Sequence, residues 1–163
     1  MFRIIISLSI FLLSNNSMAM SHHSGHSMNT NVEAISIKDP WIRAMPPKAL
    51  STAAFMIIEN NMNQGVELVS ANIEGVKSVE LHKTIADGNV MKMVKQDSMP
   101  IGPKSSLTLK PKSWHIMMIG LNKDFPEGSR HQLQLNFSNG NELIIPVTVQ
   151  KRMGSMKPMH HMH

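Results

Sequence analysis

Short runs of alternating or continuous apolar residues, separated by turn-forming residues, fill the middle of this 163-residue sequence. No segment sustains a helical period over three turns. The pattern predicts nine strands, at residues 32–37, 53–59, 67–73, 78–85, 90–96, 106–110, 115–121, 131–137 and 142–149. Nine short strands in about 120 residues are typical of an all-β, Greek-key antiparallel β-sandwich.

Residues 131–137 show the alternation most clearly. Leu133, Leu135 and Phe137 alternate with polar residues, which predicts one buried and one solvent-facing side of the strand. Asn139-Gly140 follows and is a hairpin signal into the last strand. Six prolines lie outside the predicted strands or at their ends, as a sheet requires. They are Pro46, Pro47, Pro100, Pro103, Pro111 and Pro126.

Segments at both ends of the chain differ from the strand-rich middle. Residues 1–19 contain one cation, an apolar run at 4–13 and small residues before position 20, which is the pattern of a cleaved signal peptide. We expect export to a bacterial periplasm and no stable membrane insertion, because the apolar run is too short to span a bilayer. Residues 20–31 and 152–163 are rich in Met, His or both, and we expect them to be flexible tails around one folded domain at 32–151.

Methionine and cysteine depart most from ordinary usage. The chain has no Cys, which excludes disulfide scaffolds, thiolate zinc sites, iron–sulfur clusters, blue-copper centres and cysteine nucleophiles. Its 16 Met exceed what core packing normally uses, because the thioether is flexible and specifies packing poorly. A formal charge of +5 with 4% aromatic residues argues against a nucleic-acid partner. The composition therefore favours a soft metal bound without thiolate.

A hairpin predicted around Asp87-Gly88 offers two such ligands. With these residues as the turn, His82 directly faces Met93, at a Cβ separation of about 5 Å that lets an imidazole and a thioether share one metal ion. Leu81 would then point into the core, and His82 away from it.

A second strand supplies two more ligands. His115 and Met117 are two positions apart and share a face, whereas Ile116 and Met118 share the other. Two imidazoles and two thioethers would form a neutral, soft ligand set, which favours Cu(I) over zinc, calcium and magnesium. Such a site is suited to holding Cu(I) and passing it on.

The residues around these four ligands resemble a known family. ELHKTIADGNVMKM at 80–93 and SLTLKPKSWHIMMIGL at 106–121 carry the spacing H-x10-M-x21-H-x-M. Over nearly the whole folded region the sequence resembles the periplasmic copper(I) chaperone family PCu(A)C, or DUF461. Two positions depart from the family pattern: Lys83 stands where Met is frequent, and Trp114 where Tyr is expected.

The resemblance implies a cupredoxin-like β-sandwich that binds one Cu(I) through His82, Met93, His115 and Met117. It also implies delivery of copper toward the copper A centre of cytochrome c oxidase. The implied partner is the copper A subunit or a thioredoxin-like copper assembly protein. Trp114 would shield the metal or simply pack beside it.

Other methionines and histidines have simpler interpretations. We expect Met56, Met62, Met99 and Met118 to pack in or on the core. His131 lies outside the motif and is expected to be structural. Met91 shares a face with Met93, which makes it a candidate auxiliary ligand.

Both tails carry further candidate ligands. The C-terminal tail could collect copper, as Cu(II) on imidazoles and as Cu(I) on thioethers. Its candidates are Met153, Met156, Met159, His160, His161, Met162 and His163. The N-terminal tail contributes His22, His23 and His26. Cleavage between Ala19 and Met20 would place His22 third, where the terminal amine, two amides and one imidazole form a square-planar Cu(II) site.

These observations favour a monomeric copper chaperone that is not an enzyme. An exported hydrolase or copper oxidase is the rival of another class, but the sequence has no G-x-S-x-G or other nucleophile motif. A third interpretation is a scavenger that buffers copper for tolerance. A carrier would bind one tight Cu(I) in its folded domain, whereas a scavenger would keep several ions in its tails.

Overall fold

The structure is a computed structural model that describes residues 33–88 and 90–152. These residues form an all-β domain. Its ten strands are β1 (Ile35–Arg43), β2 (Ser51–Asn60), β3 (Val66–Ile73), β4 (Val76–Asp87), β5 (Val90–Gln96), β6 (Met99–Ile101), β7 (Ser105–Leu109), β8 (Trp114–Leu121), β9 (Arg130–Phe137) and β10 (Glu142–Gln150). Each of the nine predicted strands has a counterpart, and the short β6 is additional. No helix in the described part of the chain is long and apolar enough to cross a membrane.

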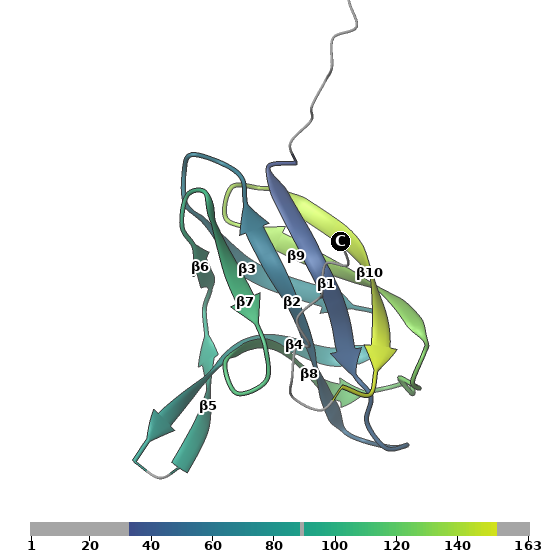
Figure 1. The fold of residues 1–163 in the computed structure, drawn as a ribbon. Coiled ribbons are helices and arrows are strands. Elements are labelled where there is room, and N and C mark those ends of the chain that lie inside the picture. Colours follow the sequence, from purple (N-terminus) through teal and green to yellow (C-terminus); the bar gives the residue numbers. More distant parts are fainter. Residues whose placement is uncertain (1–32, 89, 153–163) are drawn as a thin grey trace, which may run out of the picture. The chain divides into compact units, whose positions relative to one another are not determined.

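Strand pairing wraps the sheet into a sandwich. The hydrogen-bonded order is β5-β4-β8-β2-β1-β10-β9-β3-β6. In Figure 1, β1, β2 and β10 run side by side across the front, and β3 and β9 cross behind them. The strand pairs of the described residues are antiparallel except β1 with β10, which run parallel. The predicted Greek-key β-sandwich is therefore confirmed, with one parallel pair where the two ends of the domain meet.

The core lies between the two layers and follows the expected alternation. Leu133, Leu135 and Phe137 on β9 are buried, as predicted. Among the methionines, Met56, Met99 and Met118 are buried in the core, and Met62 packs against it. These four methionines therefore have the packing role expected from the sequence.

Strand β1 is longer than predicted because a bulge accommodates a proline. Its register with β2 shifts between Lys38 and Trp41. Asp39 there has a φ of 48°, and Pro40 has no N–H to donate. A bulge leaves the one extra residue unpaired, so the strand continues past Pro40 to Arg43. Pro100 was expected outside strands but lies in β6, a sheet edge where proline is tolerated.

The two hairpins differ in how well the sequence predicted them. The β9–β10 hairpin turns at Asn139-Gly140, where Gly140 has a φ of 82°. In the β4–β5 hairpin, however, Asp87 pairs with Val90, so the loop begins at Gly88, whose φ is 61°. The predicted pairing of His82 with Met93 is therefore wrong. Gly-Asn and Asp-Gly are both favoured turn pairs, and the turn forms one residue later than expected.

Strands β7 and β8 pair with successive halves of the same edge of β2. A four-residue turn interrupts them, closed by a 3.1 Å hydrogen bond from the amide of Ser113 to the carbonyl of Lys110. Lys112, at the third position of this turn, has a φ of 63°. The interruption brings Lys112 and Ser113 beside the start of β8, where the candidate ligands lie.

The last described residue is tied to β1. Arg152 forms a bidentate ion pair with Asp39, at 2.7 and 3.0 Å, and its guanidinium lies 5.3 Å from the centroid of the Trp41 ring. Ordered contacts thus extend one residue past the predicted end of the folded domain at Lys151.

Candidate metal centre

Two histidines lie side by side on the outer face of the β4–β8 ladder. His82 and His115 are direct cross-strand partners, and their ring centroids are 5.7 Å apart at an interplanar angle of 53°. Leu81 and Ile116 point to the other face and are buried in the core. The predicted orientation of both strands is confirmed.

The imidazole of His115 is neutral and oriented. Its Nδ1 lies 2.9 Å from the carbonyl oxygen of Ser113, which can only accept, so Nδ1 carries the proton and donates it. Burial lowers the pKa of His115 below its ordinary value of 6.5, and nearby His82 and Arg43 lower it further, against the opposing effect of the Ser113 hydrogen bond. At neutral pH, Nε2 of His115 therefore has a free lone pair.

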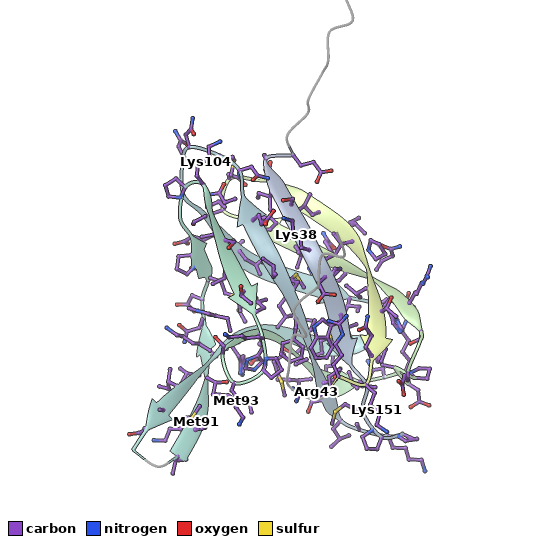
Figure 2. The ribbon with its side chains drawn as sticks, in the orientation of Figure 1. Lys38, Arg43, Met91, Met93, Lys104 and Lys151 are labelled. Carbon is purple, nitrogen blue, oxygen red and sulfur yellow. The ribbon has the colours of Figure 1, made fainter. Side chains whose placement is uncertain are left out.

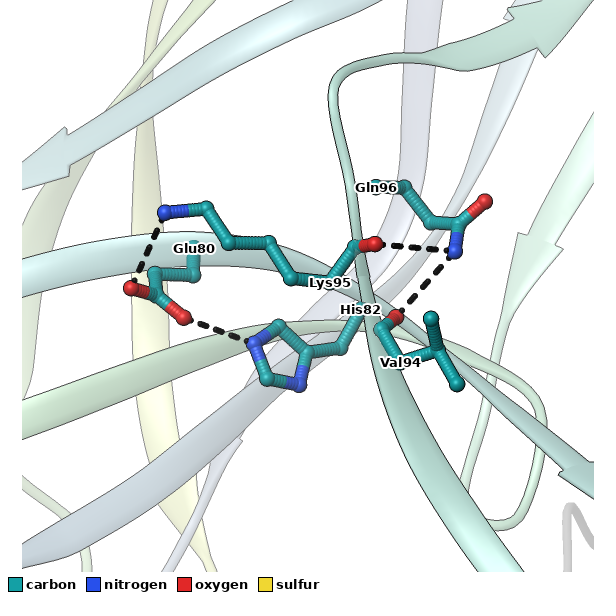
Figure 3. Close-up of polar contacts among 5 residues, drawn as sticks. All are labelled: Glu80, His82, Val94, Lys95 and Gln96. Atoms are coloured by element: carbon teal, nitrogen blue, oxygen red, sulfur yellow. Dashed lines mark hydrogen bonds and ion pairs between the residues drawn. The ribbon is translucent and has the colours of Figure 1, made fainter.

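A carboxylate orients His82. Its Nε2 donates to Glu80 over 2.8 Å, and Lys95 donates to the same carboxylate over 3.1 Å (Figure 3). The His82 hydrogen bond and then that of Lys95 lower the pKa of Glu80 below 4.5. Because an ionised carboxylate only accepts, the proton of neutral His82 sits on Nε2.

That leaves Nδ1 of His82 as an acceptor. It is a buried side-chain polar atom that has no hydrogen-bond partner in the described part of the chain. Buried polar atoms are rarely left unpaired, and such an atom requires an explanation. A metal-binding histidine commonly donates its other ring N–H to a carboxylate in this way. The environment of His82 therefore fits a metal ligand that coordinates through Nδ1.

Both predicted thioether ligands lie at a pocket next to His115. This pocket has a volume of about 210 Å³, and Met93, Met117 and His115 line it. Met117 pairs with Glu80 across the β4–β8 ladder, and Met93 pairs with Thr84 across the β4–β5 hairpin. All these residues therefore lie on the face that carries the histidines.

Met93 reaches the pocket although its predicted partner was wrong. His82 pairs with Lys95, two residues along β5 from Met93, so His82 and Met93 are diagonal neighbours on one face. His82 does not itself line the pocket and lies beside His115. In Figure 2, Met93 lies on the β4–β5 hairpin, which extends beyond the other strands, and its side chain is 63% exposed.

An aromatic wall borders the site and was not predicted. Trp41, Ala53 and Phe55 form a second buried cluster apart from the main core. The ring centroids of Trp41 and Phe55 are 4.6 Å apart, and Phe55 lies 6.4 Å from His115. The guanidinium of Arg43 lies 5.2 Å from the centroid of Phe55. Residues 53–58 are all apolar, so no alternation indicated which face carries Phe55. Glu80 could have been found, because it lies two positions before His82 on the same face.

The remaining predictions outside the ligand set have clear outcomes. Trp114 pairs with Lys83, whose ammonium lies 4.8 Å from the ring centroid, and packs against the core. Trp114 therefore packs on the face opposite His115, and the alternative of shielding a metal there is wrong. His131 packs on Phe125, with centroids 4.4 Å apart, and lies 2.9 Å from Ser129 Oγ, contacts of the structural kind expected. Met91 pairs with Ala86 and does not line the pocket.

Several predicted features lie outside the described residues. They are the signal segment, the N-terminal candidates His22, His23 and His26, and the C-terminal candidates Met153, Met156, Met159, His160, His161, Met162 and His163. Within residues 33–88 and 90–152, no three His, Cys, Asp or Glu side chains are grouped to hold a metal. The outer face instead gathers two imidazoles and two thioethers, a neutral donor set that suits a soft cation.

Sequence comparison identifies related proteins. Residues 35–149 match the family model "LpqE-like: Putative lipoprotein LpqE-like". An uncharacterized protein of Rickettsia prowazekii, RP573, is 29% identical over 120 residues, which cover 71% of this chain and 66% of that protein. The aligned region therefore spans just under two thirds of the relative's length.

Solved structures share the fold. The copper-bound PCuAC domain from PmoF2 superposes with a TM-score of 0.64 at 22% identity, covering 73% of this chain and 94% of that domain. The solution structure of CuI-DR1885 from Deinococcus radiodurans has a TM-score of 0.60 at 27% identity, covering 78% of this chain and 87% of that one. The described residues therefore share the fold of PCuAC domains.

Proposed function

The chain belongs to the LpqE-like family, which includes the PCuAC (DUF461) copper chaperone domains, and on that premise we propose that it carries Cu(I) on the outer face of β4, β5 and β8. Proteins of this family are metal-binding carriers and not enzymes. The Cu(I) form of the Deinococcus radiodurans relative supports the choice of metal. The proposed ligands are His82, Met93, His115 and Met117.

The observation that carries this proposal is the pair of free imidazole nitrogens on adjacent strands. Among residues 33–88 and 90–152, Nδ1 of His82 is buried without a hydrogen-bond partner, and the proton that His115 donates to Ser113 from Nδ1 leaves its Nε2 as an acceptor. Each imidazole is held in one tautomer by an oxygen acceptor. Their separation across one ladder and the thioethers at the adjoining pocket support a shared ion.

Ligand exposure fits a carrier better than a permanent metal site. His115 is buried on the aromatic side, whereas Met93 projects from an exposed hairpin. Four neutral donors leave the single charge of Cu(I) uncompensated, and none forms the strong bond that a thiolate would. An incoming soft ligand of a partner can therefore replace Met93 first and withdraw the ion stepwise from the histidines.

We propose that this exchange takes place in the periplasm. Export is supported by the signal-like composition of residues 1–19 and by the family's description as lipoprotein-like. The proposed recipient is the copper A subunit of cytochrome c oxidase or a thioredoxin-like copper assembly protein. The tails are proposed to collect additional copper, including Cu(II), through their imidazoles.

Titration with Cu(I) tests the assignment of the site. We expect one tight equivalent in the full chain, the same tight equivalent in a chain ending at Arg152, and loss of that equivalent in the full-length Met93→Ala variant. Unchanged affinity in Met93→Ala would show that the ligand set is wrong. Transfer of the ion to an apo copper A domain, followed by its visible absorption, tests the recipient.

A copper buffer is the second candidate function, and the abundance of Met and His in the tails favours it. A buffer would retain several ions in the tails, so the chain ending at Arg152 would lose most of its capacity. A carrier would keep its tight equivalent and lose it to the acceptor. The same titrations therefore distinguish the two functions.

A further inference from the structure

A third thioether lies at the pocket beside the proposed ligands. Met45 lines the same pocket as Met93, Met117 and His115. It comes from the loop that joins β1 to β2, on the side of the site opposite the β4–β5 hairpin. The sequence gives no motif for it, since it lies outside the H-x10-M-x21-H-x-M spacing.

The backbone on both sides of Met45 is fixed. Before it, the amide of Ala44 donates to the carbonyl of Gln150 over 2.9 Å. After it, Pro46-Pro47 restrict the backbone, and the amide of Ala49 closes a turn on the carbonyl of Pro46 over 3.2 Å. The loop therefore presents Met45 at the pocket from a set position, and only its side chain needs to move.

Packing alone does not account for this side chain. The core methionines Met56, Met99 and Met118 are fully buried, whereas Met45 lines the pocket and is 39% exposed. Its unbranched side chain has three rotatable bonds that let the sulfur reach different positions. Met45 thus combines access to solvent with access to the donors at the pocket.

We propose that Met45 is an additional thioether ligand of the Cu(I) bound at this pocket. The inference rests on the proposed function and extends its ligand set. A further soft sulfur at the pocket gives the ion a ligand while Met93 exchanges, so that the coordination of the ion is maintained during transfer. Only copper–sulfur and copper–nitrogen bonds to the ligands form and break, and the oxidation state of copper is unchanged.

The test uses the full chain labelled with ¹³C at the methionine methyl groups and Ag(I) as a redox-inert probe for Cu(I). Leucine variants of single methionines assign the resonances. We expect the methyl signals of Met45, Met93 and Met117 all to shift with the first equivalent of Ag(I). Met45→Leu should weaken Cu(I) binding about tenfold in competition with a chelator. Leucine has a similar volume, so the fold should be retained.

Met91→Leu is the matched control, because Met91 is 54% exposed on the same face as Met93 but does not line the pocket. An unshifted Met45 methyl overturns the inference, as does a Met45→Leu affinity equal to that of Met91→Leu. If Met93 and Met117 still shift in that case, the proposed function stands without Met45. If neither of them shifts, the proposed ligand set fails together with the inference.

Discussion

His82 and His115 face each other across the β4–β8 ladder, 5.7 Å apart between ring centroids, and each uses one ring nitrogen to hold its orientation. His82 donates to the carboxylate of Glu80, and His115 donates to the carbonyl of Ser113. The two remaining nitrogens are thus prepared as acceptors before any ion arrives. Such preorganisation reduces the conformational cost of binding.

Replacement of Glu80 by Gln should weaken Cu(I) binding without unfolding the domain. The amide can present either a donor or an acceptor to His82, so the Nε2–H tautomer loses its anionic partner. Loss of such an outer partner typically costs about 10-fold to 100-fold in metal affinity. The expected drop would be measured by chelator competition, and the His82 tautomer by ¹⁵N NMR.

Glu59→Gln is the control for Glu80→Gln. Glu59 is also a carboxylate that accepts from a lysine and a second side chain, Lys38 and Ser36, but it lies away from the pocket. Its replacement should leave Cu(I) affinity unchanged. Equal affinity losses in the two variants would contradict the positioning role of Glu80.

Met93→Leu should separate metal binding from stability. The side chain is exposed, so the free energy of unfolding of the apo protein should change by less than about 0.5 kcal/mol, while Cu(I) affinity falls at least about tenfold. The contrasting variant is Met118→Leu, on the buried face of β8. It should leave Cu(I) affinity intact and lower stability by up to about 1.5 kcal/mol. Denaturant unfolding measures the stability, and competition titrations measure the Cu(I) affinity. Unchanged Cu(I) affinity in Met93→Leu would show that Met93 is not a ligand.

Acid should destabilise the apo protein partly through His131. Burial, and then the charge of Lys123, lower the pKa of His131 in the folded chain below 6.5. The unfolded chain therefore binds a proton first as pH falls below about 6.5, so the free energy of unfolding decreases there and is fully present above it. Urea unfolding between about pH 7.5 and 5 should show this decrease, and His131→Gln should reduce it.

The carboxylates do not obscure the effect of His131. Glu59 and Glu80 have pKa values lowered from 4.5, so the stability that they contribute is lost only in more acidic solution. His115 has a lowered pKa as well, so part of the decrease should remain in His131→Gln. A variant with the same pH dependence as the wild type would exclude His131 as a contributor.

Lys112→Gly should stabilise the domain and slow copper transfer. Lys112 has a φ of 63°, a conformation that costs a side-chain-bearing residue about 1 kcal/mol relative to glycine, and its side chain lines the pocket. Removing the cation should lower the transfer rate to an acidic acceptor at low salt and have less effect at high salt. Stopped-flow transfer at two ionic strengths measures both effects.

Lys104→Gly provides the matched control for Lys112→Gly. Lys104 also follows a proline and has a φ of 49°, but it does not line the pocket. Lys104→Gly should also raise the stability by relieving the positive φ, but by less, because the hydrogen bond from Lys104 to the carbonyl of Asn61 is lost. The copper transfer rate should be unchanged. A transfer rate lowered equally in both lysine variants would show that the charge of Lys112 has no local role.

The sequence predicted which strand face carries the site residues, but not which residue each of them pairs with on the neighbouring strand. Alternation placed His82, His115 and Met117 on outer faces correctly, because the side-chain period of a strand is two. The partner of His82 was wrong because two overlapping turn pairs compete at Gly88. The choice between them depends on how β4 and β5 pair, which the local sequence does not specify.

Contacts between segments distant in the chain could not be predicted from the sequence pattern. The β1 bulge at Asp39-Pro40 sets the register in which Trp41 pairs with Phe55. The pairing of Ala54 with Ile116 between β2 and β8 brings Phe55 near His115. Met45 reaches the pocket from a loop whose ends are fixed by hydrogen bonds of Ala44 and Leu50 to β10 and β8. No periodic pattern encodes such relationships, since they arise from tertiary packing.

Three of the proposed ligands, His82, His115 and Met117, share strands with core residues but lie on the opposite face. Along β8, His115 and Met117 alternate with the fully buried Ile116 and Met118. Exchange of an ion on the outer face therefore requires no repacking of the interior. The donor atoms can be altered one at a time, by evolution or by design, to suit a cation of different softness while the same folded framework persists.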